Sequence, residues 1–167
     1  MGILQKSILA GLSILLVIMI LTCVIVTMQK NAEGQSDGFV VPPFDASASY
    51  GVPTDIPKEL AYGNMKIRED FKISMCTKPV VNGKDVDVYF TAGENNGVYV
   101  RLLLLNEAGE IIGESGVLKP GEYVKTILLK SALTESAAVT AKILSYEPET
   151  YYSMGTVTAQ IYLTVKK

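Results

Sequence analysis

The chain has 167 residues, a formal net charge of −2 and 49% hydrophobic residues, with no histidine and only two cysteines. The lack of histidine removes the commonest general base and metal ligand, and without a G-x-S-x-G motif no serine triad can be assembled. The acidic balance argues against nucleic acid, because affinity for nucleic acid comes mainly from neutralising phosphates. We therefore expect a protein that is not an enzyme, with no cofactor, no metal and no small-molecule substrate.

The first predicted element is an uncharged apolar segment over residues 8–28, preceded by a short tail over residues 1–7. At about 1.5 Å per residue, a helix of this length matches the roughly 30 Å of a bilayer's hydrocarbon core. So short a tail is easier to leave in the cytoplasm than to translocate. We expect one transmembrane helix in contact with the lipid bilayer, with the tail in the cytoplasm and the rest of the chain outside the cell.

Two other interpretations of this segment stay open. A cleaved signal peptide has an apolar region of about 7–15 residues followed by a small-residue cleavage site, whereas this segment is longer and lacks an A-x-A pattern after it. A lipoprotein would be acylated at Cys23, although Thr22 departs from the small residue usual before such a cysteine. The uncleaved anchor is favoured over both.

Residues 29–63 are expected to form an extracellular linker. They show no sustained period of 2 or 3.6 and contain four of the seven prolines, Pro42, Pro43, Pro53 and Pro57. Such a composition is typical of an extended tether. Four side chains of this linker are too apolar for a pure spacer and are expected to dock on the domain or on a partner: Phe39, Val40, Val41 and Phe44.

Residues 64–167 are expected to form one folded domain. Seven segments read as strands, most with the period-2 alternation of apolar and polar residues: 71–75, 85–91, 98–105, 110–114, 123–130, 138–144 and 156–166. In the last, Val157, Ala159, Ile161, Leu163 and Val165 should face inward. Regular turn signals and the absence of a long amphipathic helix predict an all-β fold, an antiparallel Ig-like β-sandwich of about seven strands.

The remaining cysteine, Cys76, ends an apparent strand, Lys72-Ile73-Ser74-Met75-Cys76. It cannot pair with Cys23 if residues 8–28 cross a membrane, so no disulfide is expected. A buried thiol that packs as a small hydrophobic group is favoured over a reactive one.

The loop before the last strand carries the candidate contact patch. It gathers three tyrosines and two acids: Tyr146, Glu147, Glu149, Tyr151 and Tyr152. One interpretation is structural, with one tyrosine buried and its hydroxyl bonded to the backbone. The other is functional, an aromatic and acidic contact surface. Since adjacent residues on extended backbone point to opposite sides, Tyr151 and Tyr152 should separate into one core residue and one exposed residue.

Two motifs, L-K-P-G-E-Y-V at residues 118–124 and Y-E-P-E-T-Y-Y-S-M-G at residues 146–155, resemble segments of small, largely uncharacterised surface proteins of Gram-positive bacteria. In that family, a membrane anchor and a Pro-rich tether precede a single Ig-like sandwich. The similarity covers about Asn64 to Val165 and brings no catalytic residue. It implies a non-enzymatic extracellular binding or scaffolding module of a bacterial cell-envelope assembly, with an envelope protein as partner. The alternative is a structural subunit of a surface appendage or of a secretion or conjugation apparatus.

Overall fold

The computed structural model of the protein describes residues 40–68 and 71–166. The expected cytoplasmic tail 1–7, the expected transmembrane helix 8–28 and the first part of the expected linker lie outside the described residues. Within the described residues, 40–68 and 71–166, no helix is long and apolar enough to cross a membrane. The helix in the described residues is a single 3₁₀ turn, η1, at Lys58–Leu60.

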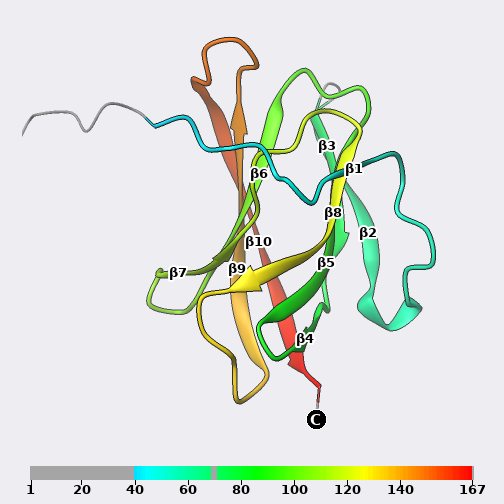
Figure 1. The fold of residues 1–167 in the computed structure, drawn as a ribbon, viewed down its shortest axis with the longest axis vertical. Coiled ribbons are helices and arrows are strands. Elements are labelled where there is room, and N and C mark those ends of the chain that lie inside the picture. Colours follow the sequence, from blue (N-terminus) through cyan, green and yellow to red (C-terminus); the bar gives the residue numbers. More distant parts are fainter. Residues whose placement is uncertain (1–39, 69–70, 167) are drawn as a thin grey trace, which may run out of the picture. The chain divides into compact units, whose positions relative to one another are not determined.

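Ten strands make up the described fold (Figure 1). Their bounds are β1 Ser49–Tyr50, β2 Tyr62–Arg68, β3 Phe71–Cys76, β4 Val80–Asn82, β5 Asp85–Ala92, β6 Tyr99–Leu105, β7 Ile111–Glu114, β8 Glu122–Leu129, β9 Ala137–Tyr146 and β10 Ser153–Val165. All seven predicted strands are confirmed, as β3 and β5 to β10. The three that were not predicted are β1 and β4, which are too short to show a period, and β2, whose sequence YGNMKIR alternates weakly.

The strands close into a barrel, so the predicted Ig-like sandwich is wrong. Strands β8, β7, β6, β9, β10, β4 and β5 pair in that order, and β5 pairs again with β8 to complete a ring of seven. In a sandwich two sheets remain separate, whereas here the pairings β10–β4 and β5–β8 make one continuous ring. The pairing of β10 with β4 is parallel, and the other pairings in the ring are antiparallel. Alternation shows which face of a strand is buried, but not which strand lies beside it.

The barrel interior is filled by apolar side chains from every strand of the ring. The predicted facing of the last strand is confirmed, because Ile161 and Leu163 are buried while Gln160 and Tyr162 are exposed. The alternation predicted for 85–91 breaks at Tyr89. The register against β8 shifts there, and Tyr89 has a positive φ of 45°, which is the mark of a β-bulge.

Part of the segment expected to be a linker packs on the barrel. The compact unit begins at Val41, and the backbone of Asp45 donates to the carbonyl of Val117 at 3.0 Å. The carboxylate of Asp45 accepts from the N–H of Gly116 at 2.7 Å. Gly116 is needed there, because a Cβ on it would lie 2.5 Å from the Cα of Asp45. The segment continues into β1, which pairs with β8.

A second, smaller apolar cluster lies outside the barrel interior. Leu60 from η1 covers Cys76 of β3 and Tyr89 of β5. This cluster holds the chain between β1 and β2 against the sheet. In Figure 1, β1 and β2 lie on the right-hand side of the barrel.

Candidate functional site

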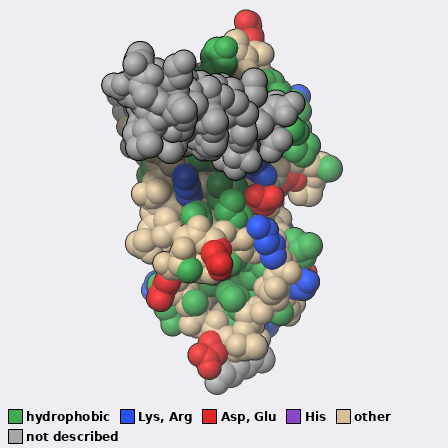
Figure 2. Space-filling model, turned by 90° about the vertical axis from the view of Figure 1, so that its left-hand side faces the viewer, with side chains coloured by type: hydrophobic (Ala, Val, Ile, Leu, Met, Phe, Trp, Pro, Cys, Tyr) green, Lys and Arg blue, Asp and Glu red, His purple; other side chains and the backbone are tan. Residues whose placement is uncertain are grey.

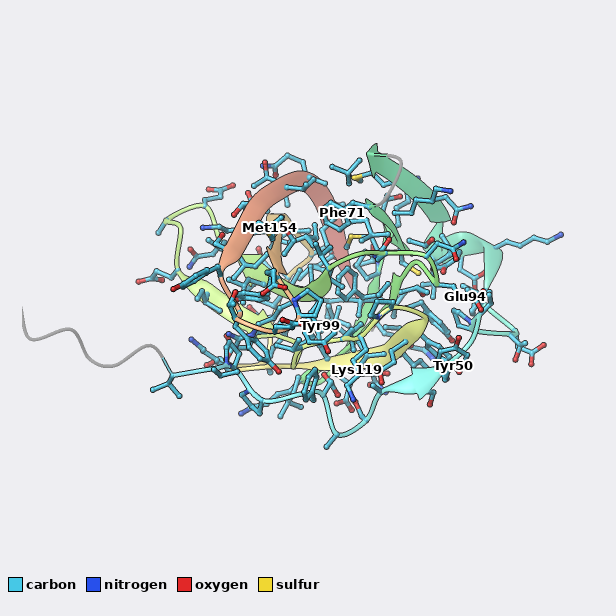
Figure 3. The ribbon with its side chains drawn as sticks, turned by 90° about the horizontal axis from the view of Figure 1, so that it is seen from above. Tyr50, Phe71, Glu94, Tyr99, Lys119 and Met154 are labelled. Atoms are coloured by element: carbon cyan, nitrogen blue, oxygen red, sulfur yellow. The ribbon has the colours of Figure 1, made fainter. Side chains whose placement is uncertain are left out.

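One candidate site is an aromatic cluster around Tyr99, which Figure 3 labels in its view of the barrel from above. Phe44 and Tyr99 meet edge to face, with ring centroids 5.4 Å apart. Tyr151 completes the cluster, with its ring centroid 6.3 Å from that of Phe44 and 5.8 Å from that of Tyr99. The ammonium of Lys119 lies 4.6 Å from the Phe44 ring centroid, within the range of a cation–π interaction. The cluster therefore joins the segment around Phe44 to the β9–β10 hairpin.

The loop of that hairpin is fixed by one carboxylate. Glu147 accepts hydrogen bonds from the backbone N–H groups of Glu149 and Thr150, at 3.2 and 2.6 Å, and from the Thr150 hydroxyl at 2.6 Å. Because these bonds favour the charged form, above all the one from the Thr150 hydroxyl, they hold the pKa of Glu147 below its ordinary value. In the backbone, the N–H of Glu147 donates to the carbonyl of Tyr152, and the N–H of Tyr151 donates to the carbonyl of Glu147, each at 2.9 Å. The loop is thus pre-organised.

Tyr152 is exposed, as one of the two tyrosines was expected to be, but Tyr151 is not a core residue. Tyr151 is half-buried in the aromatic cluster, and Tyr152 is 76% exposed. The backbone of Tyr151 also differs from the expected one, because it is left-handed, with φ of 57°, rather than extended. Met154, which the sequence did not single out, is 46% exposed just beyond Tyr152.

The five predicted patch residues differ in how far they are buried. Tyr146 is buried, Glu147 is half-buried and braces the loop, and Glu149 is exposed. Within residues 40–68 and 71–166 the tyrosine hydroxyls that have a hydrogen-bond partner are those of Tyr50 and Tyr62, neither of which belongs to this loop. The surface of the patch comes from Glu149 and Tyr152, with Met154 beside them.

A cleft of about 490 Å³ lies between β1 and the β2–β3 hairpin. Tyr50 of β1 forms one wall and is 71% exposed. Its ring lies against Gly121, where a Cβ would be 2.6 Å from a ring carbon. Its hydroxyl donates to Glu94 at 3.3 Å, and the negative charge of Glu94 raises the pKa of Tyr50. Figure 3 shows Tyr50 and Glu94 on the opposite side of the barrel end from Met154.

The rest of the cleft is mainly apolar. Met65 and Ala92 contribute to its lining, and the hydroxyls of Tyr62 and Thr91 bond to each other at 2.9 Å. Its size lies within the range of about 300–1,000 Å³ typical of ligand pockets. Sequence reasoning missed this cleft because its walls come from segments far apart in the chain, none with a motif of its own.

Groups suited to chemistry do not gather in the described residues. No group of three Cys, Asp or Glu side chains in residues 40–68 and 71–166 could hold a metal ion. Cys76 is buried, and burial, together with the charge of Asp87, raises its pKa to about 12. The thiolate is the reactive form, so this thiol is inert at neutral pH, as the sequence predicted.

Charged side chains are mixed on the face shown in Figure 2. Acidic and basic groups are interspersed there among hydrophobic and polar ones, without one region of a single sign. Such a face has no strong field that would attract a highly charged partner.

The comparisons with known proteins do not identify a family. No protein-family model matches the chain, and no curated protein matches its sequence.

Proposed function

We propose that this protein is a non-enzymatic binding module of a bacterial cell-envelope assembly. In this proposal residues 8–28 hold it in the cell membrane, and the β-barrel outside the cell contacts an envelope protein. The uncharged segment 8–28 supports the anchor, and the absence of histidine supports a function without catalysis.

The observation that carries the proposal is the display of Tyr152 and Met154 on a fixed hairpin. Tyr is a common hot-spot residue, because it buries a large surface at a small cost in conformational entropy. The Glu147 hydrogen bonds and the packing of Tyr151 fix the loop before a partner binds, and pre-organisation lowers the entropic cost of association. An exposed aromatic side chain on such a loop is suited to recognition.

The test uses the full chain with an affinity tag, purified from membranes of cells that produce it. Replacing Tyr152 by Ala should remove at least about nine-tenths of a co-purifying envelope protein, since truncating a hot spot costs about 2 kcal/mol or more. The matched control is Tyr162→Ala, which removes another exposed tyrosine, on the outer face of β10. The same partners at the same yield from both variants would contradict the proposal.

A further inference from the structure

The first half of β10 has an edge without a partner strand among the described residues. From Ser153 to Leu163, β10 pairs on one side with β9, with Thr156 opposite Leu144 and Gln160 opposite Thr140. On its other side it meets residues 77–81 only near its end. There the N–H groups of Tyr162 and Thr164 donate to the carbonyls of Thr77 and Pro79, at 3.1 and 2.9 Å.

These bonds identify the backbone groups on the open part of that edge. In a strand, the N–H and C=O of one residue point to the same side, and successive residues alternate between sides. The even-numbered residues Tyr162 and Thr164 point away from β9, so Thr156, Thr158 and Gln160 do so as well, because their pairing with β9 is regular. None of these three backbones has a hydrogen-bond partner on that side within residues 40–68 and 71–166.

The open edge also lacks the features that keep sheet edges apart. Natural edge strands are usually protected by charged side chains, prolines or bulges. From Thr150 to Val165 the chain has no charged residue and no proline. Toward the barrel interior, Val157 and Ala159 are only half-buried, so another strand beside them would cover further apolar surface.

We propose that the open edge of β10 pairs with the same edge of a second copy of this chain, antiparallel and centred on Thr158. In this register Thr158 faces Thr158 of the second copy, and Thr156 faces Gln160. Each free N–H then meets a free C=O, and the facing side chains, which are threonine and glutamine, carry no charge and so do not repel each other.

A second copy fits this edge because the edge is short and complementary to itself. Its regular part ends at Gly155, where φ is 123° and the register against β9 shifts, and at Tyr162, where residue 77 occupies the edge. A two-fold pair uses the same edge in both copies and therefore closes at two chains. It produces a dimer and, by itself, no filament.

Disulfide cross-linking of the full chain tests this pairing, in a Cys23→Ser background. Residues that exchange both hydrogen bonds of an antiparallel pair have Cα atoms about 5.5 Å apart, which suits a disulfide. Thr158→Cys should therefore form a cross-linked dimer under mild oxidation. Buried Cys76 is not expected to take part, because its thiol is inert.

Two comparisons make the test specific for register and edge. Thr156→Cys and Gln160→Cys should each give at least tenfold less dimer alone than when the two variants are produced together. Thr164→Cys, on the same face of β10 but where residues 79–81 occupy the edge, should stay monomeric. No dimer from Thr158→Cys, or equal cross-linking at positions 158 and 164, would overturn the proposal; the first result would also be seen if another protein or another segment occupies the edge.

Discussion

Removing the Tyr151 ring tests whether this side chain stabilises the β9–β10 hairpin, in contrast to the exposed side chain of Tyr152. In the Tyr151→Ala variant, the ring contacts with Phe44 and Tyr99 are lost. Each aromatic pair contributes about 0.5–1.5 kcal/mol beyond the burial of apolar area, and a half-buried tyrosine adds roughly 1 kcal/mol from that area. Alanine is no better suited than tyrosine to the left-handed backbone at this position, so no strain is relieved.

The expected loss in the free energy of unfolding is therefore about 2–4 kcal/mol. At roughly 2–8 °C for each kcal/mol, according to domain size, the melting temperature should fall by about 10 °C. The exposed side chain of Tyr152 makes no such contacts, so Tyr152→Ala should change the free energy of unfolding by less than about 0.5 kcal/mol.

Urea and thermal unfolding of the variants, followed by far-UV circular dichroism, measure these differences. Tyr151→Phe is the control, because it keeps the ring and removes only the hydroxyl, and it should behave like the natural protein. If Tyr151→Ala and Tyr152→Ala were equally stable, the aromatic cluster would not hold the loop, and the loop would not be pre-organised.

Three further predictions concern the core, the thiol and the loop carboxylate. Ile161→Asp places a charge in the barrel interior and should cost more than about 4 kcal/mol, whereas Gln160→Asp on the outer face should cost less than about 1 kcal/mol; equal losses in denaturant unfolding would contradict the register of β10. Cys76 should not react with a thiol reagent at pH 8 until the protein unfolds, and rapid labelling of the folded chain would contradict its burial. Glu147 has a lowered pKa when folded, so the stability that it contributes is present above its unfolded pKa and is lost as the pH falls through the folded value. Thr150→Val should raise that pKa toward its ordinary value in a carboxylate NMR titration, and an unchanged pKa would show that the Thr150 hydroxyl does not hold the carboxylate.

The alternation of apolar and polar residues predicted the strands well and their arrangement poorly. It located seven strands and the inward face of β10, because burial of one face leaves a period of two in the sequence. It did not predict β4, whose three residues form no pattern but whose pairings with β10 and β5 close the barrel.

The same limit applies to the segment around Asp45, which packs on the barrel, and to the candidate site. The contact of Asp45 with Gly116 rests on backbone groups and on the small size of glycine, which no hydrophobic pattern records. The composition of the tyrosine-rich loop singled it out, but Phe44 and Tyr99, which hold Tyr151, come from other parts of the chain. Only the folded chain brings them together.

Photo-cross-linking in living cells tests the proposed binding role most directly. The full chain carries p-benzoylphenylalanine at position 152, or at position 162 as the control, and the cells are irradiated before the membranes are isolated. We expect a discrete adduct with an envelope protein from position 152, and none of the same mass from position 162. Identical adducts from both positions, or none from position 152 in a chain present at normal abundance, would contradict the proposed binding role.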